Sequence, residues 1–246
     1  MKLKHLTFGI IALLGIVSCG GDDNPTSEPV TKANIIGSVN LYDEATTQVD
    51  NSNMMIKVEG ITPSISATTN SEGSFTLQEV PFGTYSISYE KQGFGTFKKF
   101  NIEHSNTGSS TILTGAPSLG QMSTTTVTGV TATANGNNIV VSVTTNPAGT
   151  NSTARYIRYF MSKNESISHE NYTFHSSGIT IRINPIEITL SQSDLTNAGF
   201  SSGETVYIRA YGDSFWSNEY EDPNLNRKIF PNLNSSTVNA VSFVVP

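Results

Sequence analysis

Cysteine, charge and long apolar stretches are all scarce in this sequence. Its 246 residues include one cysteine, Cys19, so no disulfide bond can form within the chain. Stability must therefore come from hydrophobic cores, although only 36% of the residues are hydrophobic. The one pronounced apolar run, residues 6–17, is shorter than the roughly 20 residues that a membrane-spanning helix needs.

Positive charge is also in short supply. Charged residues make up 14% of the chain, and the formal net charge is −6. Nucleic acids and anionic lipid surfaces are bound by clusters of Lys and Arg, which this composition does not provide. The sequence therefore predicts no nucleic-acid partner and no electrostatic binding to a membrane surface.

Motifs of catalysis, metal binding and cofactor binding are missing as well. The sequence has no Gly-x-Ser-x-Gly elbow, no phosphate loop and no dinucleotide fingerprint. His169-Glu170 begins like a zinc-peptidase helix, but Thr173 stands where the second histidine would be, and His175 lies six residues from His169. We predict no catalytic residue, no metal and no cofactor. Carboxylates are plentiful, so a carboxylate-dependent hydrolase remains a remote alternative.

The N-terminus has the layout of a secretory signal peptide. Lys2 and Lys4 precede the apolar run, and Ser18 is a small residue at its end. Residues 16–19, Ile-Val-Ser-Cys, resemble the lipobox of bacterial lipoproteins. That resemblance implies that residues 1–18 are removed and that acyl chains, palmitate among them, attach to Cys19 and hold the protein to a membrane. The alternatives are an N-terminal membrane anchor, for which the run is too short, and a cleavable signal without lipid.

The residues after Cys19 indicate a destination. Glycine rather than aspartate follows Cys19, which resembles lipoproteins that are passed on to the outer membrane. The pair Asp22-Asp23 resembles the acidic tracts of surface-displayed lipoproteins, or is a solvated acidic spacer. Residues 19–32 contain little to bury, which predicts a flexible tether. The predicted location is the outer membrane, with the body of the protein exposed at the surface.

Short strands separated by turn residues predict a first domain over residues 33–106. Apolar residues alternate with polar ones around residues 35–41, 54–58, 75–77 and 85–89, so one face of each strand is buried. Residues 70–73, Asn-Ser-Glu-Gly, predict a tight turn with Gly73 at positive φ. A second turn is expected at residues 81–83, Pro-Phe-Gly.

Four segments of this region together resemble the carboxypeptidase regulatory-like domain. They are Gly-Ser-Val at 37–39, residues 69–75, residues 80–85 and residues 89–94. The family is a small prealbumin-like β-sandwich, so the resemblance implies that fold. The catalytic domain of carboxypeptidases is absent from this sequence, and no peptidase activity carries over.

Residues 107–120 predict a linker with a possible last strand at 111–113, and residues 121–246 predict a second sandwich. Asn135-Gly136 is a hairpin signal, and about seven or eight strands follow in turn-separated succession. Leu195 followed by residues 203–211 resembles the sixth strand of a fibronectin type III domain, and residues 155–162 resemble its third. An early tryptophan is lacking, and the connection before the final strand is too long for a plain module.

That long connection, residues 211–236, holds the candidate binding residues. Aromatic rings stack on the apolar faces of sugars while neighbouring polar groups bond the hydroxyls. The candidate ligand contacts are Asp213, Phe215, Trp216, Glu219, Tyr220 and Asp222. The alternative is that Phe215 and Trp216 fold back as a plug over the end of the sandwich.

The sequence thus predicts an all-β chain of two tandem β-sandwich domains behind a signal peptide and a tether. The leading functional interpretation is a non-catalytic surface lipoprotein that binds glycan or a protein partner. A purely structural, adhesin-like spacer of an envelope complex is the alternative.

Overall fold

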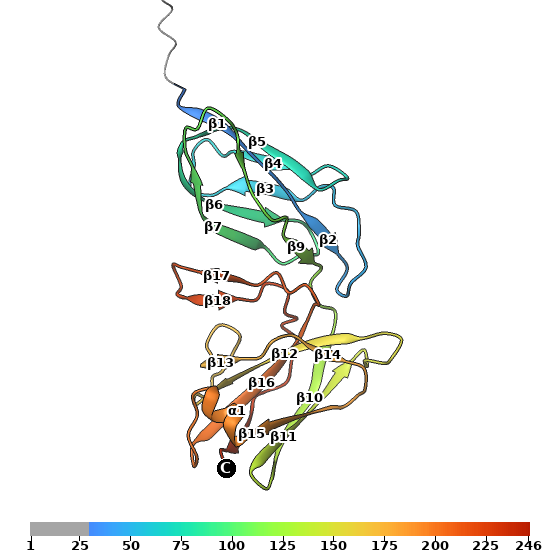
Figure 1. The fold of residues 1–246 in the computed structure, drawn as a ribbon. Helices are drawn as coiled ribbons and strands as arrows, with labels where there is room; N and C mark the ends of the chain where they lie inside the picture. Colours follow the sequence, from blue (N-terminus) through green and yellow to red (C-terminus); the bar gives the residue numbers. More distant parts are fainter. Residues whose placement is uncertain (1–29) are drawn as a thin grey trace, which may run out of the picture. The chain divides into compact units, whose positions relative to one another are not determined.

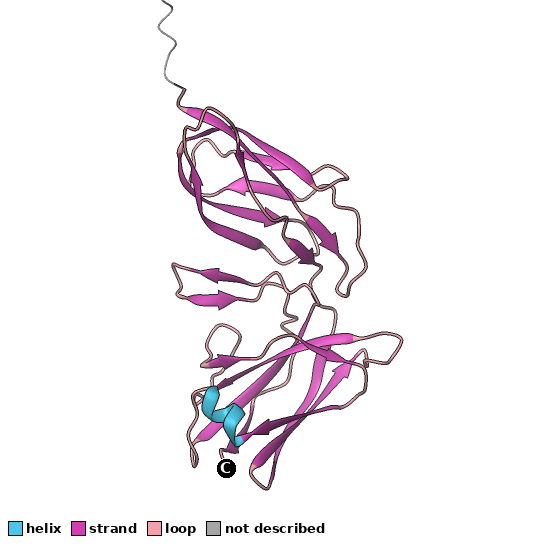
Figure 2. Ribbon diagram, in the orientation of Figure 1, coloured by secondary structure: helices cyan, strands magenta, loops and turns pink. Residues whose placement is uncertain are grey.

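Strands dominate the computed structural model, which describes residues 30–246 (Figures 1 and 2). The predicted signal peptide, Cys19 and most of the predicted tether lie outside the described residues. The prediction of an all-β chain of sandwich domains is confirmed. One short helix interrupts the strands, and within residues 30–246 no helix is long and apolar enough to cross a membrane.

The first nine strands form the first sandwich. Two sheets, ordered β5-β1-β8 and β4-β3-β6-β7, pack around one core, and β2 pairs with β9. Ile35 and Leu77 reach this core from one sheet, while Ile56 and Ile87 reach it from the other, and all four are fully buried. The strands are β1 (Lys32–Ser38), β2 (Asn40–Tyr42), β3 (Met55–Val58), β4 (Ser66–Thr68), β5 (Ser74–Pro81), β6 (Gly83–Glu90), β7 (Phe97–His104), β8 (Thr111–Ile112) and β9 (Ser118–Gly120).

The local turns follow the residues that predicted them. The Gly73 N–H donates to the Asn70 carbonyl at 2.9 Å, and Gly73 has a φ of +81°. The Asn70 side chain accepts from the Glu72 and Ser74 N–H groups at 3.1 and 2.8 Å, which closes the connection before β5. The turn at residues 81–83 joins β5 directly to β6.

The segment predicted as a linker does more than connect. Strand β8, within it, pairs in parallel with β1, and β9 pairs in parallel with β2. Edge strands leave backbone N–H and C=O groups unpaired, and this segment supplies partners for both of them. The Gly/Ser/Thr-rich composition indicated a linker because the segment has few apolar side chains. Its strands pair through backbone hydrogen bonds, which do not depend on apolar side chains.

The remaining strands form the second sandwich, apart from β17 and β18, which pair with each other in a small separate hairpin. Its sheets are ordered β10-β11-β15 and β13-β12-β16-β19, with β14 also paired to β12. Val141 and Val143 meet Ile157 and Ile208 across the core. The elements are β10 (Thr126–Asn135), β11 (Asn138–Asn146), β12 (Arg155–Ser162), β13 (Phe174–His175), β14 (Ile179–Ile181), β15 (Ile186–Ser191), α1 (Gln192–Asn197), β16 (Thr205–Asp213), β17 (Tyr220–Asp222), β18 (Arg227–Ile229) and β19 (Val241–Val244).

In the second sandwich the sequence predicted the hairpin between β10 and β11 but not helix α1. The Asn135-Gly136 hairpin is present, because β10 ends at Asn135, β11 begins at Asn138 and Gly136 has a φ of +60°. Helix α1 was not predicted, because six residues are too few to display a helical period. Its start is marked by a capping box in which the Ser191 and Asp194 side chains each bond the other's backbone N–H.

Strand β12 is buried on both faces, and the long connection explains why. Its odd-numbered residues from Ile157 to Met161 enter the main core. On the opposite face, Phe160 packs with Tyr211, Phe230 and Leu233 in a separate small core. Phe230 and Leu233 belong to the connection between β16 and β19, which therefore covers the outer face of this sheet as well as linking two strands.

The same connection contacts the first sandwich through two buried asparagines. The Gly120 N–H donates to Asn218 Oδ1 at 2.8 Å, and the Gly95 N–H donates to Asn232 Oδ1 at 3.0 Å. Asn218 Nδ2 donates to the Gly95 and Gly120 carbonyls at 3.1 and 3.0 Å and to Asn232 Oδ1 at 2.9 Å. Asn232 Nδ2 donates to the carbonyls of Gly120 and Trp216 at 2.9 and 2.7 Å. These bonds form a network that we call the asparagine junction.

Glycine is required where the two chains of the junction meet. A Cβ on Gly95 would lie 2.4 Å from the Pro231 backbone, and one on Gly120 would lie 2.5 Å from the Trp216 carbonyl oxygen. A further contact joins Glu44, in the loop after β2, to Arg155 at 2.5 Å and to the backbone N–H of Phe215 at 3.0 Å. Residues 31–246 accordingly form one compact unit.

Burial of Tyr89 predicts a loss of stability at alkaline pH. Burial raises the pKa of Tyr89 from 10.0 to about 12. Above pH 10 the unfolded chain ionises this phenol while the folded chain holds it neutral, so ionisation favours unfolding until the folded pKa is passed. Two pKa units correspond to about 2.7 kcal/mol, lost as the pH rises through that window.

Denaturant unfolding of the parent chain and of a Tyr89→Phe variant, repeated at several pH values, measures this effect. Other groups titrate equally in both proteins, so the difference in slope isolates Tyr89. The parent should lose more unfolding free energy than the variant above pH 10. Parallel pH profiles would contradict the burial of the Tyr89 hydroxyl.

Candidate functional site

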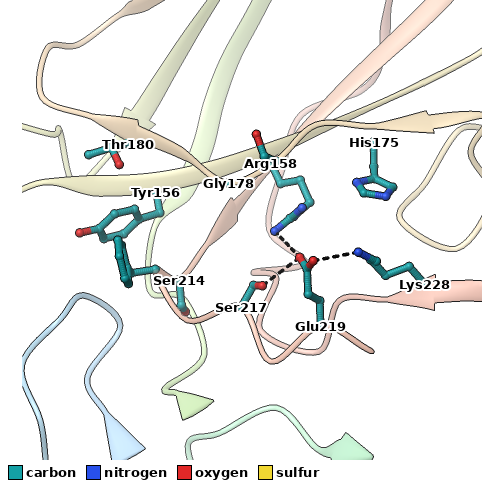
Figure 3. Close-up of a pocket in the computed structure, with 11 residues that line it drawn as sticks. Tyr156, Arg158, His175, Gly178, Thr180, Ser214, Ser217, Glu219 and Lys228 are labelled. Carbon is teal, nitrogen blue, oxygen red and sulfur yellow. Dashed lines mark hydrogen bonds and ion pairs between the residues drawn. The ribbon is translucent and has the colours of Figure 1, made fainter. Parts of the chain in front are cut away.

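A hollow of about 430 Å³ lies where the connection crosses the sheet of the second sandwich (Figure 3). We call it the larger hollow, and it is bordered by β12, by the chain between β13 and β14, and by residues 214–219. The residues that matter most for its chemistry are Tyr156, Arg158, Thr180, Phe215, Glu219 and Lys228.

Arg158 lines the larger hollow, and its buried guanidinium has three polar partners. Its side chain is 4% exposed, and Nε donates to Asp213 Oδ2 at 2.9 Å. Nη1 donates to the Ser176 carbonyl at 2.7 Å, and Nη2 lies 2.7 Å from Glu219 Oε2. The guanidinium also lies 4.5 Å from the centre of the Phe230 ring. A buried guanidinium needs such partners, because an unpaired one costs several kcal/mol.

Asp213 is the buried carboxylate that pairs with Arg158. It is the last residue of β16, directly opposite Tyr156 on β12, and it is 1% exposed. Burial raises the pKa of Asp213, and the neighbouring Arg158 charge opposes that rise. Asp213 was predicted as a ligand contact, and that contact stays a prediction. In this structure its carboxylate is enclosed and paired with Arg158.

Glu219 is fixed by three donors, as Figure 3 shows. Arg158 reaches Oε2, Lys228 Nζ lies 3.0 Å from Oε1, and Ser217 Oγ donates to Oε2 at 3.0 Å. Partial burial favours the neutral acid, but the Lys228 bond and the two positive charges prevail and hold the pKa of Glu219 below its ordinary value. Glu219 is therefore a charged acceptor in a set position at neutral pH.

Phe215 supplies an exposed ring at the edge of the larger hollow. Phe215 is 47% exposed, although apolar residues of this size are usually buried. The ring is supported edge-on by Tyr156 at 5.6 Å and by Trp216 at 5.1 Å between ring centres. The structure thus brings two of the predicted residues, Phe215 and Glu219, to one hollow.

The rings of Trp216 and Tyr220 pack against the first sandwich. The Trp216 ring packs 5.1 Å from that of Tyr42, and the Tyr220 ring packs 6.0 and 5.9 Å from those of Phe97 and Phe100. For Trp216 the plug and the ligand contact both stay predictions, and for Tyr220 the ligand contact stays one.

Asp222 is separated from the larger hollow. It ends β17 and lines a different hollow, of about 240 Å³, with Phe100 and Arg227. Its Oδ1 accepts from the Asn224 and Leu225 N–H groups at 2.9 and 3.2 Å, which closes the turn between β17 and β18. The local bonds of Asp222 are those of a turn residue.

Sequence reasoning missed the cationic half of the site. Arg158 and Lys228 were not proposed, and neither was Tyr156. A usable signal was present for Arg158, because a charged residue inside the aromatic run of β12 requires a buried partner. Lys228 gave no such signal, since β18 is only three residues long and has no visible alternation.

Histidine packs among aromatic rings in the described part of the chain. Within residues 30–246 no group of three His, Cys, Asp or Glu side chains is placed to hold a metal ion. His169 lies edge-on to Tyr211, and burial lowers the pKa of His169. His175 lies 4.9 Å from the Phe230 ring and borders the larger hollow.

Comparison with known proteins identifies no family. No protein-family model matches the sequence, and no curated protein matches it either. Among solved structures, a proposed carbohydrate-binding protein from Bacteroides uniformis shares 15% identity, with 87% of this chain and 99% of that chain covered and a TM-score of 0.30. Proteins of the DUF3823 family from Bacteroides ovatus and Parabacteroides merdae share 12% and 11% identity. The alignments cover 87% and 75% of this chain and 100% and 92% of those chains, with TM-scores of 0.30 and 0.27.

Proposed function

We propose that this chain is a non-catalytic binding protein whose larger hollow takes a glycan. The observation that carries the proposal is the pairing of an exposed ring, Phe215, with a fixed carboxylate, Glu219, across one hollow. Its volume of about 430 Å³ lies within the roughly 300–1,000 Å³ that is usual for ligand pockets.

The chemistry of these groups suits a sugar. The face of a pyranose ring is apolar and packs against an aromatic ring, while its hydroxyls donate to carboxylates and accept from ammonium groups. Phe215 offers the ring, Glu219 the acceptor and Lys228 a donor. Thr180 adds a hydroxyl that both donates and accepts. Because Glu219 is held before a ligand arrives, binding costs little ordering of its side chain.

The same residues argue against hydrolysis. Most glycosidases place two carboxyl groups on either side of the scissile bond, one as acid and one as base or nucleophile. Among the described residues that line the larger hollow, Glu219 is the only carboxylate. Asp213 is enclosed behind Arg158 and is not among them. Binding without catalysis is therefore the function that this arrangement supports best.

The proposal also includes the cellular location of the protein. The resemblance of residues 16–19 to a lipobox supports a lipoprotein that is acylated on Cys19 after removal of residues 1–18. The glycine after Cys19 and the acidic pair that follows support display at the outer-membrane surface. A binding module held there would meet external polysaccharides or neighbouring envelope proteins.

Strand order supports the family resemblances as proposals. In the second sandwich, three strands (β10, β11 and β15) face a sheet built on β12, β16 and β19. Sandwiches of the immunoglobulin type divide their strands between two sheets in a comparable way. The first sandwich has the two-sheet form that the carboxypeptidase regulatory-like resemblance implies.

A structural spacer is the second candidate, and the asparagine junction favours it. Two sandwiches joined by buried hydrogen bonds transmit a fixed geometry along the chain, which is what a spacer in an envelope complex requires. A stable membrane partner that co-purifies equally well with a Phe215→Ala variant would favour the spacer.

Removal of the exposed ring should weaken glycan binding. We expect a Phe215→Ala variant to bind its best oligosaccharide about tenfold or more weakly, because the stacking surface is lost. Isothermal titration of the purified chain against a panel of neutral plant and microbial oligosaccharides measures the affinity. Leu225→Ala removes another exposed apolar side chain, outside the larger hollow, and should leave the affinity unchanged.

Two results would contradict the glycan proposal. One is a panel that gives no saturable heat with the parent chain. The other is a Phe215→Ala variant that remains folded and binds as tightly as the parent.

Lipidation is tested on Cys19 itself. Cells that are fed an alkyne analogue of palmitate should incorporate label into the parent chain and none into a Cys19→Ser variant, since the serine hydroxyl cannot form the thioether. The parent should partition with membranes, and the variant should not. Equal labelling of the two chains, or a parent chain without label, would contradict the proposal that Cys19 is acylated.

A further inference from the structure

A second, smaller hollow adjoins the larger one and extends it toward the first sandwich. The smaller hollow has a volume of about 190 Å³. Phe215, Ser217 and Glu219 line both hollows, so the two share one wall. The far side of the smaller hollow is formed by Phe97 of β7 and Ser118 of β9, which belong to the first sandwich.

The two hollows differ in what each could hold alone. The larger lies within the roughly 300–1,000 Å³ range of ligand pockets, and the smaller falls below it. A ligand confined to the smaller hollow would bury little surface. A ligand already seated in the larger one could reach it by crossing the ridge at Phe215, whose ring is exposed there.

The shared wall is held from both sides, so it keeps its shape without a ligand. The Phe215 N–H donates to the Glu44 carbonyl at 3.0 Å, and Glu44 belongs to the first sandwich. Glu219 is held by Arg158 and Lys228. Between them, Asn218 is buried in the asparagine junction. A wall that is ordered in advance saves the entropy that a flexible loop would lose on binding.

We propose that the site takes an elongated oligosaccharide of several units, which lies across the Phe215 ridge with one end in each hollow. The inference rests on the proposed function and specifies its ligand as a chain of sugars rather than a single one. Both sandwiches then contribute contacts to one ligand, and the junction between them sets the spacing of the subsites. The cations of the larger hollow are already paired with Glu219 and Asp213, so neutral chains suit the site.

Chain-length dependence tests this inference directly. The full chain, kept in a zwitterionic detergent, is titrated with glucose, xylose and mannose and with their β-1,4-linked oligomers of two to six units. We expect the affinity to rise about tenfold or more from the single sugar to the longer oligomers of the bound series, and then to level off once both hollows are filled.

Trp216 provides a second readout, because it is the only tryptophan and it lines the smaller hollow. Its emission should shift on binding of the longer oligomers and should stay unchanged when the single sugar fills only the larger hollow. A shift of equal size with a single sugar would contradict the assignment of the two ends.

A variant in the first sandwich separates the two hollows. Ser118→Gln places a larger side chain in the smaller hollow and should lower the affinity for the longest oligomer by about tenfold, while that for the shortest bound sugar is retained. Ser66→Gln is the matched control, since Ser66 is an exposed serine on another three-residue strand. The control should bind every oligomer as the parent does.

The possible failures are distinguishable. If oligomers and single sugars bind with equal affinity, or if Ser118→Gln binds the longest oligomer like the parent, the elongated-ligand inference is wrong while glycan binding stands. If no sugar of any length binds, the proposed function fails, and this inference fails with it.

Discussion

The buried side-chain amides of Asn218 and Asn232 hold the long connection against the first sandwich, and the candidate site depends on that placement. Together the two amides bond backbone groups of Gly95, Gly120 and Trp216. A buried donor or acceptor without a partner costs about 1–3 kcal/mol. These bonds therefore favour one placement of the connection against the first sandwich. That placement sets the positions of Phe215 and Glu219, which belong to the connection.

A series of ion pairs then fixes the charged groups of the larger hollow. Asp213, at the end of β16, holds Arg158, and Arg158 holds Glu219 from the neighbouring strand. Lys228, on the small hairpin formed by β17 and β18, completes the set. Groups from two sheets and one loop thus converge on a single carboxylate, which gives the site a fixed acceptor beside an exposed ring. An arrangement of this kind suits recognition, where the groups must be in position before the ligand arrives.

The sequence predicted the parts of this protein that depend on local patterns. Alternation located most of the longer strands, and the residues at 70–73 and at 135–136 located two turns, because side-chain period and turn chemistry act within a few residues. The aromatic cluster of the connection also indicated where the candidate site lies. The asparagine junction could not be foreseen, because Asn218 and Asn232 bond residues about 100 positions or more away, and an asparagine in a polar loop carries no mark of burial. The facing of Trp216 and Tyr220 toward the first sandwich was hidden for the same reason.

Hydrogen exchange at the Gly95 and Gly120 amides tests the central claim that the connection is fixed to both sandwiches. Both glycines lie in a polar loop or at a strand end, where an unpaired amide exchanges with solvent rapidly. In this structure each N–H donates to a buried asparagine oxygen. Residue-resolved exchange followed by NMR should therefore find both amides slowed by about a thousandfold or more relative to an unstructured peptide. Exchange of these two amides at the unstructured rate, beside protected strands in both sandwiches, would contradict the account.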